Sequence, residues 1–273
     1  MTTRQAPNDT SLAVRLNRWT QIFSRRWLTI LLIFVAIYAG LPVAAPFLMK
    51  AGLTGAGETI YSLYSSMCHQ YSFRSWFLFG EQAVYPREAA HIGGLQPYES
   101  FLSEVDATIK AQNYQPPPGY IEAAPSADQA LGLQSKYFLG NEQLGYKIAV
   151  CQRDVGIWWA LLIGGMVYSI PVVRKYLRPV PWWLYILLGI VPIGIDGFSQ
   201  LLSAPLPPIW TQGFWPLRES TPFFRTITGA LFGLMNAWLA FPYLEESARE
   251  VDGEISAKFA RREQRLQRES SKS

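Results

Sequence analysis

Four stretches of the chain are almost free of charged residues, and each is long enough to cross a lipid bilayer. They cover residues 27–49, 155–173, 180–202 and 222–244. A helix rises about 1.5 Å per residue, so about 20 apolar residues span a hydrocarbon core of about 30 Å. The mean hydropathy of the chain is only +0.08, because polar segments flank these stretches. The sequence therefore predicts an all-α polytopic membrane protein with four transmembrane helices and an external insert.

Lysine and arginine are distributed unevenly around these stretches. Five arginines lie in residues 1–26, three bases in residues 174–178 and seven in residues 245–273, whereas the loop between the third and fourth stretches has only Arg218. Short cytoplasmic loops carry an excess of these residues. Both terminal segments are therefore expected to be cytoplasmic tails, which places residues 50–154 on the extracytoplasmic side.

Most of the extracytoplasmic segment has the composition of a loop. Residues 116–119 read Pro-Pro-Pro-Gly, and the Ala/Ser/Gly-rich run up to about residue 132 shows no periodicity. Residues 99–112 are predicted to form a short helix. The chain has only two cysteines and two histidines, which are too few for a disulfide scaffold or a multi-metal site.

Two charged side chains lie inside the predicted spans, where each costs a few kcal/mol unless it is paired. Asp196 is in the third stretch with Gln200 one helical turn later, and Arg225 and Thr228 are near the start of the fourth, after Glu219. We expect Asp196 and Arg225 to form a buried ion pair in a polar pocket that opens outward. The alternative is a pair that only holds two helices together.

The fourth stretch also carries a packing pattern. Gly229 and Gly233 are four residues apart, so they lie on the same face of a helix. Small residues at this spacing let two helix backbones approach closely in a membrane. A close helix contact is therefore expected at this face.

Four short polar stretches stand near the ends of the predicted spans. They are Cys68-His-Gln-Tyr-Ser-Phe-Arg-Ser75, Cys151-Gln-Arg-Asp-Val-Gly156, Asp196-Gly-Phe-Ser-Gln200 and Glu219-Ser-Thr-Pro-Phe-Phe-Arg-Thr-Ile-Thr-Gly229. Taken in order, they resemble the signature stretches of a bacterial membrane protein family known as domain of unknown function 2085 (DUF2085). The resemblance covers about residues 60–80 and 146–240. It implies a four-span protein of the bacterial plasma membrane whose biochemical activity is not established.

The chain departs from the family pattern at three positions. Ser72 stands where the family has a proline, Asp154 replaces the second cysteine of Cys-x-Arg-Cys, and Pro222 stands where asparagine is usual. The loss of that cysteine removes a thioredoxin-like redox pair.

A second departure concerns chain length. In typical members the two cysteine stretches are nearly adjacent, whereas here residues 81–145 separate them. The resemblance therefore implies a hairpin with arms at residues 76–79 and 147–151, decorated by this inserted loop.

Such a hairpin would bring Cys68 and Cys151 together at the outer surface. One interpretation is a zinc site made by Cys68, His69, Cys151 and Asp154, since aspartate can replace a thiolate in a tetrahedral ligand set. The other is a disulfide between the two cysteines, which is common on an oxidising face. Both remain open from the sequence.

Two classes of function fit these residues. In the first, Arg74, Arg153 and Arg225 bind an anionic lipid head group or a small anion, or the cluster serves a membrane scaffold. In the second, the protein is a membrane-embedded, metal-dependent hydrolase or transferase with Asp196 or Glu219 as base. The sequence has no Gly-x-Ser-x-Gly, His-Glu-x-x-His or P-loop motif, which favours binding. The expected partners are the bilayer and such an anion, with no nucleic acid.

Overall fold

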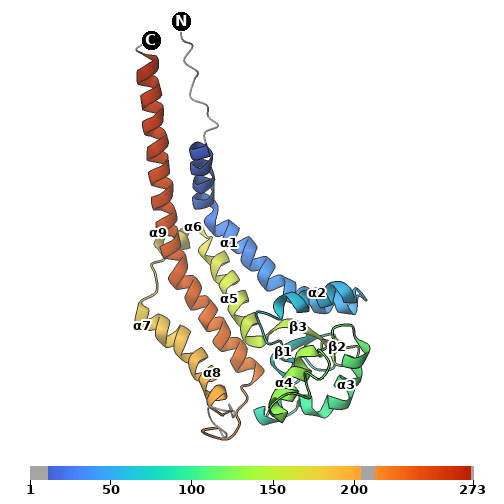
Figure 1. Cartoon of the computed structure of the whole chain (residues 1–273). Coiled ribbons are helices and arrows are strands. Elements are labelled where there is room, and N and C mark those ends of the chain that lie inside the picture. The colour runs from blue at the N-terminus through green and yellow to red at the C-terminus, as the bar shows by residue number, and fades with distance from the viewer. Residues whose placement is uncertain (1–11, 204–212, 272–273) are drawn as a thin grey trace.

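The structure is a computed structural model that describes residues 12–203 and 213–271. It is mostly helical with a small antiparallel sheet (Figure 1). The helices and strands, in chain order, are α1 (Leu12–Lys50), α2 (Thr54–Tyr64), β1 (Ser75–Leu78), α3 (Leu102–Ala111), α4 (Ala127–Tyr137), β2 (Gly140–Asn141), β3 (Gly145–Cys151), α5 (Gln152–Tyr168), α6 (Pro171–Tyr176), α7 (Trp182–Leu184), a π-helical turn (Tyr185–Ile190), α8 (Val191–Ser203) and α9 (Pro222–Ser270). Short 3-10 turns cover Ser72–Arg74, Glu88–Ala90 and Tyr98–Phe101.

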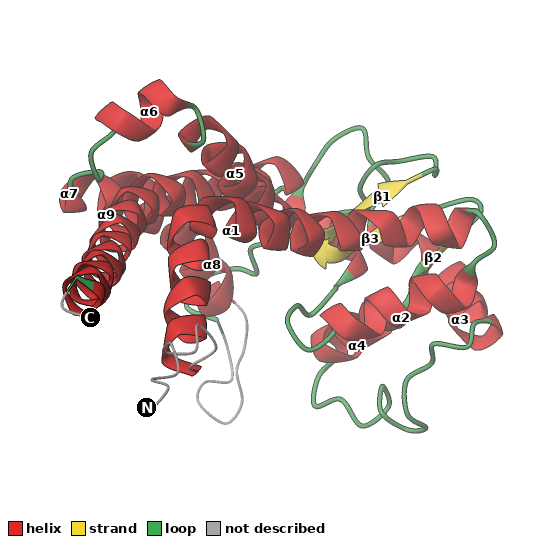
Figure 2. Cartoon of the chain, turned by 90° about the horizontal axis from the view of Figure 1, so that it is seen from above, coloured by secondary structure: helices red, strands yellow, loops and turns green. Residues whose placement is uncertain are grey.

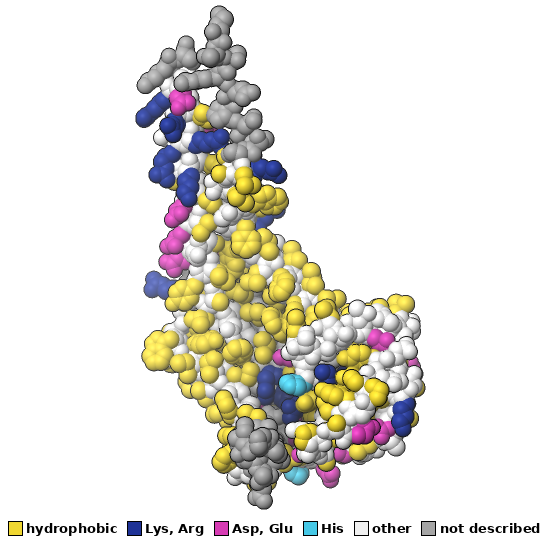
Figure 3. Space-filling view, viewed as in Figure 1, with side chains coloured by type: hydrophobic (Ala, Val, Ile, Leu, Met, Phe, Trp, Pro, Cys, Tyr) yellow, Lys and Arg dark blue, Asp and Glu magenta, His cyan; other side chains and the backbone are white. Residues whose placement is uncertain are grey.

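Three helices of the described chain are long and apolar enough to cross a membrane. They are α1, the continuous run from α7 to α8, and α9. Their exposed apolar side chains cover the middle of the molecule, above which lysine and arginine gather (Figure 3). Three of the four predicted stretches lie in these helices. The remaining stretch, residues 155–173, is divided between the 17-residue helix α5 and the short helix α6.

Helices α1 and α9 are longer than their apolar stretches, and they lie side by side where α1 begins and α9 ends (Figure 1). The guanidinium of Arg25 on α1 donates to Asp252 on α9 at 2.8 Å, and Gln21 donates to Ser256 at 2.9 Å. Helical structure therefore continues into the segments that the sequence marks as tails, because the two polar extensions bind each other.

The same region is held by one buried carboxylate. Glu245 on α9 accepts a hydrogen bond from Trp27 Nε1 on α1 at 2.9 Å and from Arg249 Nε at 2.7 Å. It also pairs with Arg174 on α6. Glu245 thus joins three helices at this end of the bundle.

Helices α5 and α9 pack with their backbones in contact. A Cβ atom added to Gly229 would lie 2.3 Å from the Arg153 carbonyl oxygen, and one added to Gly233 would lie 2.1 Å from the Ile157 carbonyl oxygen. On the facing helix, Gly156 is equally close to the Thr226 carbonyl oxygen. The close contact predicted from the glycine spacing is confirmed, and its partner is α5.

The polar segment after α2 lies on one side of the molecule together with α2 and the end of α1 (Figure 2). Leu139 and Ala149 share a buried core with Ala45, Met49 and Tyr61 of these two helices. Strand β1 pairs antiparallel with β3, and Ser75 is opposite Cys151. Strand β2 pairs antiparallel with the other edge of β3. The predicted hairpin arms are confirmed, but the all-α expectation is wrong here, because the arms and β2 form a three-stranded sheet.

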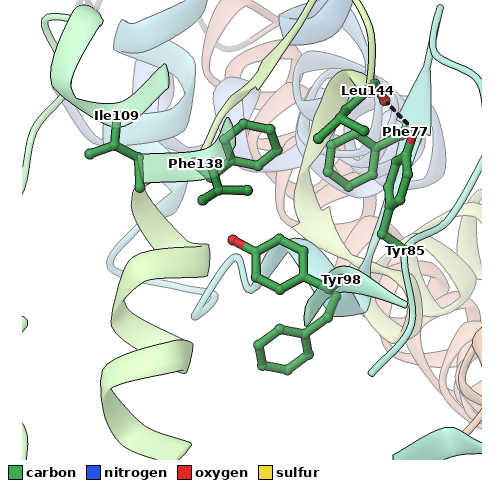
Figure 4. Packing of buried hydrophobic residues seen from close by; sticks show 8 residues of the cluster. Phe77, Tyr85, Tyr98, Ile109, Phe138 and Leu144 are labelled. Carbon is green, nitrogen blue, oxygen red and sulfur yellow. Dashed lines mark hydrogen bonds between the residues drawn. The ribbon is translucent and has the colours of Figure 1, made fainter. Parts of the chain in front are cut away.

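The insert has its own aromatic core (Figure 4), in which the Tyr85 hydroxyl donates to the Leu144 carbonyl oxygen at 3.0 Å. The buried members of this core are Phe73, Phe77, Tyr85, Tyr98, Val105, Ile109, Phe138 and Leu144. It is supported by a buried lysine, Lys147, whose ammonium donates to the carbonyl oxygens of Gln70, Ser135 and Lys136. The insert is thus a folded unit rather than an open loop.

Two helices of the insert differ in how well the sequence predicts them. The helix expected at residues 99–112 is confirmed as α3. The expectation of a loop up to residue 132 is wrong from residue 127 onward, because α4 begins at Ala127. The Ser126 hydroxyl caps this helix by accepting from the Gln129 amide. Gly132 then packs α4 on the Tyr71 ring, at 3.3 Å from an added Cβ.

The glycine contact predicts a destabilising substitution. Gly229→Ala or Gly233→Ala should lower the thermal unfolding midpoint in detergent, because the methyl group must push the two backbones apart. Overpacking of this kind costs about 1 to 3 kcal/mol. Gly194→Ala in α8 is the matched control, since an added Cβ there meets nothing within 4 Å. That control should unfold at or above the wild-type midpoint, and equal losses at all three glycines would contradict the contact.

Candidate functional site

A polar pocket of about 250 Å³ lies where the insert meets the helices. Lysine or arginine side chains and a histidine are visible at this junction (Figure 3). We call it the arginine pocket, and it is lined by Met67, Cys68, His69, Gln70, Tyr71, Arg74, Cys151, Arg153, Asp154, Gln200 and Arg225. An adjoining cavity of about 160 Å³ shares Tyr71, Arg74 and Gln200 with it and includes Arg218 and Glu219.

The secondary structure explains why residues so distant in sequence meet here. Arg74 directly precedes β1, and Cys151 ends β3 at the same end of the hairpin. Arg153 is in the first turn of α5, which starts one residue after that strand. Arg225 is in the first turn of α9, whose start is capped by the Thr221 hydroxyl accepting from the Phe224 amide. The pocket thus lies at the amino-terminal ends of two helices.

Glu219 holds two of the arginines. Arg74 donates to both of its carboxylate oxygens, at 2.9 and 3.0 Å, and Arg225 pairs with the same carboxylate. The side chains of Glu219 and Arg225 are almost fully buried, whereas that of Arg74 remains 35% exposed. Arg74 also stacks on Tyr71, with its guanidinium carbon 5.6 Å from the ring centroid. A bidentate pair of this kind is strong and directional.

Asp196 binds two further arginines, Arg153 and Arg218. Its carboxylate pairs with Arg153 from α5 and lies 3.6 Å from a guanidinium nitrogen of Arg218. The predicted direct pair with Arg225 is wrong, because Glu219 occupies that guanidinium. Depth along the helix axes suggested Arg225, whereas it is the long side chain of Arg153 that reaches α8, at 3.7 Å from a Cβ added to Gly197.

Gln200 connects the two carboxylate clusters. Its amide nitrogen donates to the Asp196 backbone oxygen at 2.8 Å and to the carboxylate at 3.3 Å, while its amide oxygen accepts from Arg225. Thr228 is buried nearby, but its hydroxyl donates to the Phe224 carbonyl oxygen of its own helix at 2.9 Å. Thr228 is therefore packed beside the cluster rather than bonded to it.

Two cysteines and an aspartate form one wall of the pocket. The Cys151 amide donates to Cys68 Sγ at 3.3 Å, and Cys151 Sγ lies 3.1 Å from Asp154 Oδ2. Both cysteines are free thiols. The pKa of Cys151 is lowered because Cys68 donates to its sulfur, and the same hydrogen bond, with burial, raises the pKa of Cys68. The expected approach of the two cysteines is thus present.

His69 does not join this group, although the zinc interpretation included it. Its ring packs against Tyr71, with centroids 5.3 Å apart, and the three ligand atoms that converge come from Cys68, Cys151 and Asp154. The left-handed backbone of the next residue, Gln70, with φ of +55°, turns the chain at this point. Asp154 thus lies with the two sulfurs, whereas the His69 ring lies against Tyr71.

Gln70 and Arg218 are among the residues of the site that were not singled out from the sequence. Gln70 is fully buried, and its side chain donates to the carbonyl oxygens of Tyr61 and Ala149, which ties the cysteine stretch to α2 and β3. Its place inside the Cys-His-Gln-Tyr signature was the available signal. Arg218 was counted only as a loop base, and its position next to Glu219 could have indicated its role.

The site carries a surplus of positive charge. Four guanidinium groups, from Arg74, Arg153, Arg218 and Arg225, face the carboxylates of Asp196 and Glu219. The Asp154 carboxylate in the pocket wall is the third negative group. Within the described residues, the Arg153 Nε donor is buried without a hydrogen-bond partner, as are two acceptors, Gln70 Oε1 and Asp196 Oδ1. Buried polar atoms normally have partners. The excess of guanidinium donors, with Arg153 Nε unused, is therefore suited to an anion with several oxygen acceptors.

The long apolar helices and the polar site at their ends define a membrane protein. The family described as "Predicted membrane protein (DUF2085)" matches residues 143–239, which confirms the resemblance over three of the four signature stretches. The uncharacterised protein MJ1492 of Methanocaldococcus jannaschii is 30% identical over 105 residues, which cover 37% of this chain and 56% of that protein. The chain thus spans about half the length of this relative. No solved structure matches the chain described here.

The revised pairing of Asp196 can be tested by a double-mutant cycle in detergent. The effects of Asp196→Asn and Arg153→Gln on the unfolding free energy should be non-additive by about 0.5 to 3 kcal/mol. Removing either charge leaves the other charge of the pair without its partner. Asp196→Asn combined with Arg249→Gln, near the middle of α9 and paired with Glu245, should be additive. Additive effects for Asp196 and Arg153 would show that the two side chains do not interact.

Proposed function

We propose that this membrane protein binds a phosphate-bearing anion, either a lipid head group or a free phosphate, in the arginine pocket. The observation that carries the proposal is the convergence of four arginines on only two carboxylates. Guanidinium groups bind phosphate oxygens through paired, charge-assisted hydrogen bonds. With Asp154 counted among the carboxylates at the pocket, one guanidinium charge remains in excess and supplies the net attraction.

The backbone favours the same ligand. Helices α5 and α9 both begin at the pocket, and helix amino termini attract anions through their free amides and dipoles. Asp196 and Glu219 are both occupied by arginines, so neither is free to act as a catalytic base. This supports binding over the hydrolase or transferase alternative. A purely structural cluster would have less reason to leave the buried Arg153 donor unused.

We further propose that α5 crosses the bilayer with the three longer helices, as a fourth span. Its 17 residues reach about 26 Å, close to the thickness of the hydrocarbon core. The backbone contact with α9 supports this placement, because it keeps α5 beside an apolar helix. Both terminal segments would then be cytoplasmic and the arginine pocket would face the outside of a plasma membrane. The asymmetry of lysine and arginine supports this orientation.

Reporter fusions test the orientation. A reporter fused after Arg178 or after Ala260 should be active in the cytoplasm, whereas one inserted at the exposed Gly119 of the insert should report the opposite side. A cytoplasmic signal at Gly119 would contradict the orientation without affecting the binding proposal.

Anion binding should appear as stabilisation of the folded protein. A ligand present at about 100 times its dissociation constant stabilises by about 2.7 kcal/mol. We expect either inorganic phosphate in detergent or phosphatidic acid in phosphatidylcholine nanodiscs to raise the unfolding midpoint. An effect of the lipid alone would identify a head group, and an effect of both would identify the phosphate group itself.

The binding experiment has a matched pair of variants. Arg74→Gln should weaken binding about tenfold or more, equivalent to about 1.4 kcal/mol, and should fold because Glu219 keeps Arg225 as partner. Arg261→Gln removes the same charge from the exposed end of α9 and should bind like wild type. Absence of stabilisation by both probes, or equal effects of the two variants, would leave the scaffold interpretation.

A further inference from the structure

The wall of the arginine pocket contains three groups that are arranged like metal ligands. Cys68 Sγ, Cys151 Sγ and a carboxylate oxygen of Asp154 all lie within 4.8 Å of one another. In a tetrahedral zinc site, two sulfurs at about 2.3 Å from the ion are about 3.8 Å apart. The three side chains can therefore meet one ion with small rotamer changes.

The fold holds these groups from three directions. Cys68 follows α2, and its amide is bonded to the Tyr64 carbonyl oxygen at 3.0 Å. Cys151 ends β3, and Asp154 lies one turn later at the start of α5. The hydrogen bond from the Cys151 amide to Cys68 Sγ, at 3.3 Å, is the kind of outer contact that orients a sulfur ligand. The arrangement is thus fixed by the backbone.

We propose that Cys68, Cys151 and Asp154 bind one zinc ion whose fourth coordination position opens into the arginine pocket. Two sulfur ligands select zinc over magnesium and calcium, which prefer oxygen. Three protein ligands leave one tetrahedral position for water or an anion oxygen. The same three residues line the pocket with Arg74 and Arg153, so an anion held by arginines can also reach the metal.

Charge supports the assignment. Two thiolates and a carboxylate this close would repel one another when ionised, and zinc compensates two of their three charges. The loaded site then carries one negative charge, which leaves the surrounding arginines still in excess. The zinc site stands by itself, whereas coordination of the anion by zinc rests on the proposed function.

Metal analysis tests the zinc site directly. The full-length protein, purified in detergent without chelator, should contain one zinc ion per chain. Cys68→Ser, Cys151→Ser and Asp154→Asn should each lose most of it. His69→Ala should keep it, because the histidine is outside the set, and His91→Ala in the insert is the distant control. A purified protein that has no zinc and takes up none on addition, or has a Cys68–Cys151 disulfide, would overturn the proposal.

Cobalt replacement gives a readout that does not depend on the folding of variants. Wild-type protein loaded with Co²⁺ should show thiolate-to-metal charge-transfer absorption, and added inorganic phosphate should shift the cobalt d–d bands. Arg74→Gln should keep the charge-transfer absorption but require more phosphate for that shift. A cobalt spectrum without thiolate bands would reject the metal site. Thiolate bands with no response to phosphate would reject only the open position, because anion stabilisation of the protein is measured separately.

Discussion

The backbone contact between α5 and α9 determines the geometry of the site. Gly229 and Gly233 allow the carbonyl oxygens of Arg153 and Ile157 to lie where side chains would otherwise stand. This contact fixes the start of α5 beside the start of α9, which places Arg153 near Arg225. Because α5 directly follows β3, the same contact also fixes the positions of Cys151 and of the end of the hairpin. The charged pocket thus depends on glycines that touch no ligand.

Neutralisation of buried charge explains the polar network. Asp196 and Glu219 are each almost completely buried, and each is shared by two arginines rather than paired with one. Sharing gives each carboxylate two positive neighbours and leaves the arginines in excess. The network therefore holds helices and insert together while keeping a positive surface on the pocket. Structural and binding roles are compatible in such an arrangement.

The parts of this structure that the sequence predicts are those set by local rules. Apolar runs and the Gly229 and Gly233 spacing each follow from a short pattern, whereas the hairpin is implied by the family resemblance of the cysteine stretches. The ion-pair partner of Asp196 could not be predicted from such a pattern, because it depends on how the helices are rotated and tilted against one another. Helix α4 was missed because its stability comes from the Ser126 cap and from packing on Tyr71, which composition does not reveal.

Helix α9 links two fixed polar points of the molecule. Arg225 is bound at one end by Glu219, and Glu245 is bound about 20 residues later by Trp27 and Arg174. At 1.5 Å per residue these points are about 30 Å apart, which equals the hydrocarbon thickness of an average bilayer. Because neighbouring elements hold both points, the helix has little freedom to tilt or slide. A thinner or thicker membrane would have to deform around the protein, so hydrophobic mismatch itself would favour its residence in bilayers of this thickness.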